Sequence, residues 1–200
     1  VDEAPDLVTT YKNLLRDQPD ESVTILTVGH PHGLVHLMRD SEGARLVREK
    51  VLRWVAMGGP WNFGQCGVDA YMEELLNRWE KNLYVSLAGQ EVLTGNCLLP
   101  DTPSANPVRE AYRLYRNSLV TGRSSWDQLA VLFVVCPQHF RVIDHGRHER
   151  TAPEKTVWNP DENNPQHHLV VPKTEREKLT RLIENLMVKE GKAGCEPPTE

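Results

Sequence analysis

The chain has 200 residues, a net charge of −5 and 39% apolar residues, as expected of a soluble globular protein with a sizeable core. Its Lys and Arg residues are scattered, which argues against a nucleic-acid-binding surface. No apolar run approaches the roughly 20 residues of a membrane-spanning helix.

The first residues are acidic and polar, unlike a signal peptide, and the sequence leaves the compartment open between export and the cytoplasm. The four cysteines form no C-x-x-C pair, which argues against a zinc knuckle or a thioredoxin motif. We expect free thiols, with two disulfides as the alternative, because Cys136 lies in an apolar run where cysteine behaves as a small hydrophobe.

Strand-like and helix-like segments alternate along the chain. Apolar periodicity predicts helices over 5–16, 33–40, 42–50 (capped by Ser41), 68–79, 106–119, 125–135 and 174–190. Short apolar runs predict strands over 22–29, 51–59 and 83–89, and looser strands over 139–146, 155–159 and 167–171.

This alternation, with glycines at the strand ends, predicts an α/β fold: a mostly parallel sheet flanked by helices, with a small β appendage near the C-terminus. We expect a single domain over residues 1–190 and a flexible tail over 191–200. Ligands of such sheets bind at the carboxyl ends of the strands, so the segments that follow each strand are the places to search for a site.

Three segments carry unusual chemistry. "VGHPHGLVH" contains His30, His32 and His36, and "MGGPWNFG" places Trp61 and Asn62 after two glycines that let a ligand approach the backbone. In "GRSSWDQLAVLFVV", Asp127 stands in the first turn of an otherwise almost wholly apolar helix, where a carboxylate is costly unless something positive meets it.

Each candidate has a simpler structural interpretation. An Asp in the first turn of a helix is most often a cap or a partner of the helix dipole. The three histidines have a spacing that suits zinc, but such residues in a loop are more often surface or capping groups. Trp61 by itself is typical of a core, and the pair His167 and His168 is typical of a sheet edge.

The ordered segments "VTILTVG", "GLVHLM", "WVAMGG", "WNFG", "VSLAGQEVLTG", "NPVREAY" and "GRSSWDQLAVLFVV" together resemble the inosine–uridine-preferring nucleoside hydrolase family. The closest likeness is to its divergent nucleoside hydrolase-like, or cellulose-binding-like, branch. The resemblance runs from about Pro5 to the final helix and implies a Ca²⁺ ion that binds two ribose hydroxyls.

The resemblance also implies roles for individual residues. Asp127 matches a calcium ligand at the start of a late helix, and His32 falls where a backbone carbonyl binds the same ion. Met57, with the two glycines after it, matches a strand end that contacts the sugar. Asn62 matches a residue that grips ribose hydroxyls, and Trp61 is an aromatic replacement in the same motif.

The departures from the family concern the catalytic groups. The Asp-rich loop that supplies the remaining calcium ligands and the general base has no counterpart in this chain. We therefore expect the chain to lack the N-terminal part of the fold, with its general base outside these residues. Pro60 stands in place of a Glu, and Trp126 stands where many relatives have a His; an indole can stack on a leaving group but cannot protonate it.

The sequence therefore favours a nucleoside hydrolase-like protein that hydrolyses an N-glycosidic bond of a ribonucleoside or related glycoside with the help of Ca²⁺. Two alternatives stay open: a catalytically impaired carbohydrate-binding protein on the same scaffold, and one subunit of a split protein. The expected partner is a ribose-containing or other sugar ligand, with no nucleic acid or membrane. A homo-oligomer and a separate chain that carries the missing N-terminal part are both left open.

Overall fold

The computed structural model describes residues 4–58, 69–152 and 155–188. The chain divides into two compact units, which we describe separately: Val1–Leu87 with Val142–Leu169, and Ala88–Arg141 with Val170–Glu200. Whether the two units form the single domain predicted over residues 1–190 stays a prediction. The tail predicted over 191–200 lies outside the described residues.

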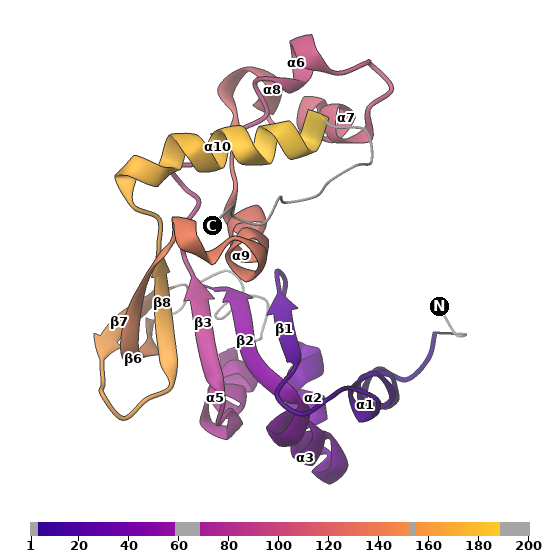
Figure 1. Ribbon diagram of the computed structural model, residues 1–200, viewed down its shortest axis with the longest axis vertical. Coiled ribbons are helices and arrows are strands. Elements are labelled where there is room, and N and C mark those ends of the chain that lie inside the picture. The colour runs from indigo at the N-terminus through magenta and orange to yellow at the C-terminus, as the bar shows by residue number, and fades with distance from the viewer. Residues whose placement is uncertain (1–3, 59–68, 153–154, 189–200) are drawn as a thin grey trace, which may run out of the picture. The chain divides into compact units, whose positions relative to one another are not determined.

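A six-stranded sheet organises the first unit, in the order β1-β2-β3-β8-β6-β7 (Figure 1). Its strands are β1 (Val23–Thr27), β2 (Val51–Met57), β3 (Asn82–Ser86), β6 (Arg141–Ala152), β7 (Lys155–Pro160) and β8 (Gln166–Val170). β1, β2, β3 and β8 pair in parallel, and β6 and β7 form an antiparallel hairpin. The mostly parallel α/β sheet predicted from the sequence is confirmed, and the β appendage is the hairpin that extends it.

Four helices pack beside the strands of this unit: α1 (Leu7–Arg16), α2 (His32–Arg39), α3 (Ser41–Lys50) and α5 (Asp69–Arg78). Their apolar residues share one core with the strands, which includes Leu34, Leu46, Trp54 and Leu75. The Trp54 side chain is fully buried, and its Nε1–H donates to Thr27 Oγ1 at 2.9 Å, so the indole adds apolar burial without an unpaired polar atom.

The helix α3 begins one residue earlier than predicted, and its cap is a different residue. The Asp40 carboxylate accepts a hydrogen bond from the Gly43 backbone N–H at 2.8 Å, so Asp40, and not Ser41, caps α3. Either residue type suits the position, and only the path of the chain between α2 and α3 decides between them.

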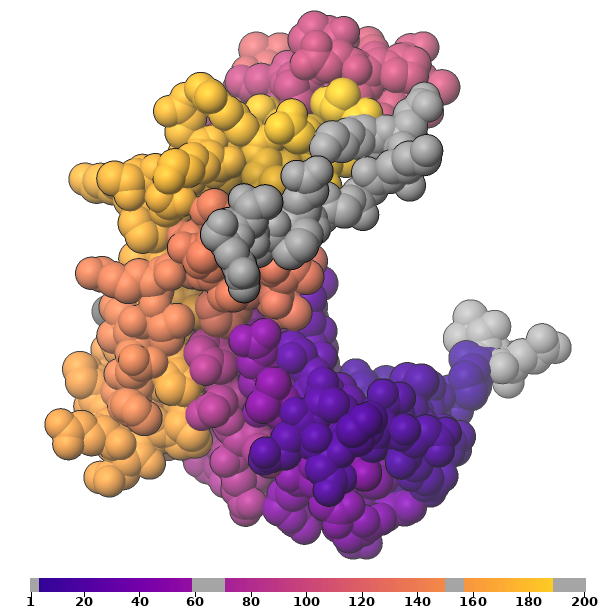
Figure 2. Space-filling model, viewed as in Figure 1, coloured from indigo at the N-terminus to yellow at the C-terminus, as the bar shows by residue number. Residues whose placement is uncertain are grey.

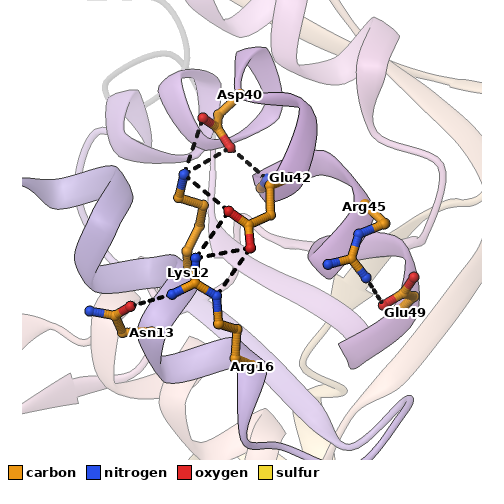
Figure 3. A network of polar contacts seen from close by, with 8 residues as sticks. Lys12, Asn13, Arg16, Asp40, Glu42, Arg45 and Glu49 are labelled. Carbon is orange, nitrogen blue, oxygen red and sulfur yellow. Dashed lines mark hydrogen bonds and ion pairs between the residues drawn. The ribbon is translucent and has the colours of Figure 1, made fainter.

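A polar network ties α1 to α3 at the surface (Figure 3). Lys12 lies 3.2 Å from the Asp40 carboxylate and 3.4 Å from that of Glu42, and Arg16 binds Glu42 through two nitrogens. The space-filling view shows the indigo and violet atoms of α1–α3 as one continuous surface (Figure 2). Because these groups are exposed to solvent, the network orients α1 while the apolar core supplies most of the stability.

The second unit is mainly helical. It contains a two-stranded antiparallel ladder, β4 (Leu93–Thr94) with β5 (Arg123–Ser124). Its helices are α6 (Leu98–Asp101), α7 (Pro107–Leu114), α8 (Ser118–Thr121), α9 (Trp126–Val135), the 3-10 helix η1 (Pro137–His139) and α10 (Lys173–Val188). Apolar residues of α9 and α10, including Leu129, Leu132, Leu179 and Ile183, form its main core.

Two cysteines of this unit, Cys97 and Cys136, form no disulfide. None of the helices in the described part of the chain has both the length and the apolar composition that crossing a bilayer requires.

Candidate functional site

The segment after β1 places His32 at the start of a helix. His32 is the first residue of α2, and Pro31 precedes it as the N-cap without a side-chain hydrogen bond. Its imidazole packs edge-on against Tyr71, with ring centroids 5.2 Å apart, and against His30 at 5.9 Å. The ring of His32 therefore has a packing role, and its backbone carbonyl remains the atom that the nucleoside hydrolase resemblance singles out.

The zinc interpretation of His30, His32 and His36 gains no support from the geometry. The Tyr71 ring packs against both His32 and His36, at 5.2 and 6.3 Å between centroids. Nowhere in residues 4–58, 69–152 and 155–188 do three or more His, Cys, Asp or Glu side chains form a group that could hold a metal ion.

The carboxyl end of β2 carries the second predicted element. Met57 is the last residue of β2 and pairs with Ser86, the last residue of β3. The next residue, Gly58, is buried and donates its N–H to the Ser86 carbonyl at 3.0 Å. The main chain after Met57 is thus held against the neighbouring strand. Trp61 and Asn62, which follow in the same predicted motif, lie outside the described residues.

In the second unit, a buried chain of hydroxyl groups positions the start of α9. Thr94 Oγ1 lies 2.8 Å from Ser125 Oγ and 3.0 Å from the Tyr112 hydroxyl, and the residues Thr94 and Ser125 are fully buried. Ser125 precedes Trp126, the first residue of α9. Because each hydroxyl has a partner, this network of hydroxyl groups fixes the direction in which α9 leaves β5.

A glycine permits the close approach of the preceding loop to this helix start. Gly89 has a φ of +130°, and a Cβ built on it would lie 2.6 Å from Trp126 Cα and 2.7 Å from Trp126 N. The Ser125 N–H also bonds the Gly89 carbonyl at 3.2 Å. Only glycine fits at this position, because a side chain would collide with the backbone of Trp126.

Asp127, in the first turn of α9, meets a positive charge from its own unit. The residue is exposed to solvent, so it is not buried in the way the apolar sequence around it suggests. Loss of water on the protein side raises the pKa of the Asp127 carboxyl, and the positive charge of Arg123 opposes that rise. Among the described residues no donor forms a hydrogen bond to this carboxylate, and the helix N-cap, Ser125, makes no side-chain cap bond.

Arg123 and Tyr115 join Trp126 in a cation–aromatic cluster that sequence reasoning missed. The Arg123 guanidinium carbon lies 4.0 Å from the centroid of Tyr115 and 5.9 Å from that of Trp126. Such stacking holds a guanidinium in place without using its N–H donors. Arg123 stands four residues before Asp127, and this proximity in the sequence was the available signal.

The described residues do not by themselves fit a calcium ion. Ca²⁺ takes six to eight oxygen ligands, and Asp127 offers one carboxylate with a guanidinium nearby. His32 belongs to the first unit and Asp127 to the second. Two predicted ligands are therefore present in the chain, but a complete ligand set is not found among the residues described.

The sequence matches no model of a protein family, and no curated protein matches it. Solved structures do match. One, titled a purine-preferring ribonucleoside hydrolase from Gardnerella vaginalis, has a TM-score of 0.58 at 13% identity, over 92% of this chain and 67% of that one. Another, titled an inosine–uridine-preferring nucleoside hydrolase from Bacillus anthracis, has a TM-score of 0.52 at 17% identity, over 90% of this chain and 66% of that one.

At these identities the likeness establishes the fold alone. The chain spans about two thirds of the length of the hydrolase structures that it matches. The similarity covers about nine tenths of the chain described here, and it confirms the fold that the sequence resemblance implied. The chain therefore has a nucleoside hydrolase-like α/β fold.

Proposed function

We propose that the protein binds a ribonucleoside or a related glycoside and hydrolyses its N-glycosidic bond with the assistance of Ca²⁺. The observation that supports this most is the fold likeness to two nucleoside hydrolases over about nine tenths of the chain. The carboxylate of Asp127 adds to it, because it stands at the start of α9 without a hydrogen-bond donor among the described residues.

In this proposal each predicted residue has one task. Asp127 would supply an oxygen ligand to Ca²⁺, and the His32 carbonyl would supply another. When bound, the ion would supply an acidified water molecule and a binding site for sugar hydroxyls. Met57 and Asn62 contact the sugar. The other ligands and the general base come from outside the residues described here.

The two tryptophans favour contact with an aromatic aglycone. Trp126 is half-buried and lies beside the Arg123 guanidinium, a surface on which a nucleobase can stack. In the proposal Trp126 or Trp61 faces the base. Neither indole can protonate a departing base, so the base takes the electron pair of the N-glycosidic bond and receives its proton from water.

The alternative is a carbohydrate-binding protein on the same scaffold, and it rests on the same tryptophans. Pro60 and Trp126 carry no ionisable group, whereas stacking of an aromatic ring on a sugar or base needs none. A binding protein of this kind retains its ligand without turnover.

A paired assay separates these functions. The complete protein, with the part that supplies the general base, is incubated with inosine and with p-nitrophenyl riboside at about 1 mM Ca²⁺, in the range of weak calcium sites. Both product release and ligand retention are measured. Turnover that falls at least about tenfold in Asp127→Asn, but not in the surface variant Asp101→Asn, supports the hydrolase. Retention without turnover, weakened in Trp126→Ala, supports the binding protein. A protein that shows no turnover and no ligand retention would refute both proposed functions.

A further inference from the structure

Two histidines and a tryptophan form a cluster on one face of the sheet in the first unit, on strands β6, β7 and β8. His148 of β6 is 4% exposed and stands directly opposite Trp158 of β7 in the strand register. The ring centroids of His148 and Trp158 are 4.8 Å apart, those of His148 and His168 are 5.5 Å apart, and those of Trp158 and His168 are 5.7 Å apart. The three rings therefore pack against one another as one cluster.

The polar atoms of this cluster are buried without partners. His148 Nδ1, His148 Nε2, His168 Nδ1 and Trp158 Nε1 have no hydrogen-bond partner in the part of the chain that the structure describes. Leaving such an atom unpaired destabilises the fold, and buried polar groups in proteins are almost always paired. The two nitrogens of one imidazole point in different directions, so one bound ion or water satisfies one nitrogen of His148 and the other nitrogen needs a second partner.

The backbone holds the rings in these positions. The Trp158 indole lies over Gly146, where an added Cβ would come within 2.1 Å of Trp158 Cζ2. The His148 backbone N–H donates to Gln166 Oε1 at 2.9 Å, which ties β6 to β8. The strand pairing and the glycine under the indole therefore fix the positions of the three rings in the sheet.

The distance between the imidazoles suits a shared metal ion. A Zn–N bond of about 2.1 Å, plus about 1.1 Å from the nitrogen to the ring centre, places each centroid about 3.2 Å from the ion. Two such ligands at a tetrahedral angle have centroids about 5.3 Å apart, close to the 5.5 Å observed. Burial also lowers the pKa of His148 to about 3, which keeps the imidazole in the neutral form that ligates metals.

We propose that His148 and His168 bind a first-row transition-metal ion such as Zn²⁺, and that the Trp158 Nε1–H donates to a further, oxygen ligand of this ion. The protein supplies two ligands, and the remaining positions belong to water or to an exogenous anion. His168 is only partly buried, so it forms the side from which the ion enters. This site is independent of the proposed glycosidase site, since imidazoles suit transition metals and Ca²⁺ prefers oxygen ligands.

The test is a titration of the metal-free full chain with Co²⁺ and Zn²⁺. We expect visible absorption bands from bound Co²⁺ that Zn²⁺ removes, at about one ion per chain. His168→Gln and His148→Gln should each weaken binding at least tenfold, and His36→Gln, an exposed matched control, should leave it unchanged. Quenching of tryptophan fluorescence by Co²⁺ should fall in Trp158→Phe, which locates the ion at this cluster.

Circular dichroism of each variant shows whether it folds, and His168→Gln keeps the test valid if the more buried His148 does not tolerate substitution. Equal metal affinity in the wild type and in a folded His168→Gln variant would overturn the proposal. So would a folded wild type that binds neither ion, in which case water molecules alone satisfy the four nitrogens.

Discussion

The two histidines on opposite faces of strand β8 differ in whether their ring nitrogens have polar partners. His167 is 6% exposed, and its ring nitrogens lie 3.1 Å from the Asp144 carboxylate and 3.2 Å from Asn82 Oδ1, while the ring stacks on Tyr84 at 4.5 Å. The next residue, His168, contacts His148 on the other face, where Nδ1 of His168 and both nitrogens of His148 have no partner in the described chain.

This difference separates a structural histidine from one that needs an external ligand. The surroundings of His167 provide a polar partner for each nitrogen, so burial of that ring is compensated within the protein. The surroundings of His148 provide none, and the compensation has to come from a bound ion or water. The hydroxyl chain of Thr94, Tyr112 and Ser125 behaves like His167: it is complete, and it positions α9.

The largest effect that sharpens this comparison is the pH dependence of stability. Burial lowers the pKa of His148 from its ordinary value of 6.5 to about 3. As the pH falls below 6.5, the unfolded chain takes up this proton and the folded chain does not. The contribution of His148 to the free energy of unfolding is therefore complete above 6.5 and falls by about 1.4 kcal/mol per pH unit toward pH 3.

Urea denaturation between pH 7 and pH 4 measures this slope. In metal-free protein, His148→Phe should reduce the slope by close to one proton, because phenylalanine fills the site and cannot titrate. An unchanged slope in the folded variant would show that His148 is not the buried neutral group described here.

A smaller effect distinguishes the two faces at neutral pH. In metal-free protein, His167→Phe should lower the free energy of unfolding by about 1–2 kcal/mol, because it removes the polar contacts of the ring with Asp144 and Asn82. His148→Phe should leave the free energy of unfolding unchanged or raise it, because it removes two unpaired nitrogens. Chemical denaturation at pH 7.5 with a chelator compares the two variants. An equal loss of unfolding free energy in both would contradict the difference between the two histidines.

The sequence predicted the strands of the parallel sheet well because each is a short apolar run closed by polar or glycine residues. β1 and β2 lie within the predicted segments, β3 begins one residue before its predicted segment, and α1, α2, α5 and α10 follow from apolar periodicity. The short elements β4, β5, α6 and α8 were missed, because two to four residues are too few to show a period.

Pairing over long distances in the chain accounts for the other errors. The strand β8 was expected near an edge, but it pairs with β3 inside the sheet, and so His167 is buried rather than peripheral. No local pattern reveals this register. The role of Arg123 beside Tyr115 and Trp126 was missed for the same reason, since Tyr115 comes from a separate turn of the chain.

The central claim, that Asp127 serves a cation and not its own helix, is tested most directly by calorimetric titration of Ca²⁺ into the wild type, Asp127→Asn and the surface control Asp101→Asn. We predict that the wild type and Asp101→Asn bind Ca²⁺ with equal affinity and that Asp127→Asn loses at least tenfold. Equal affinity in all three folded proteins would contradict the account.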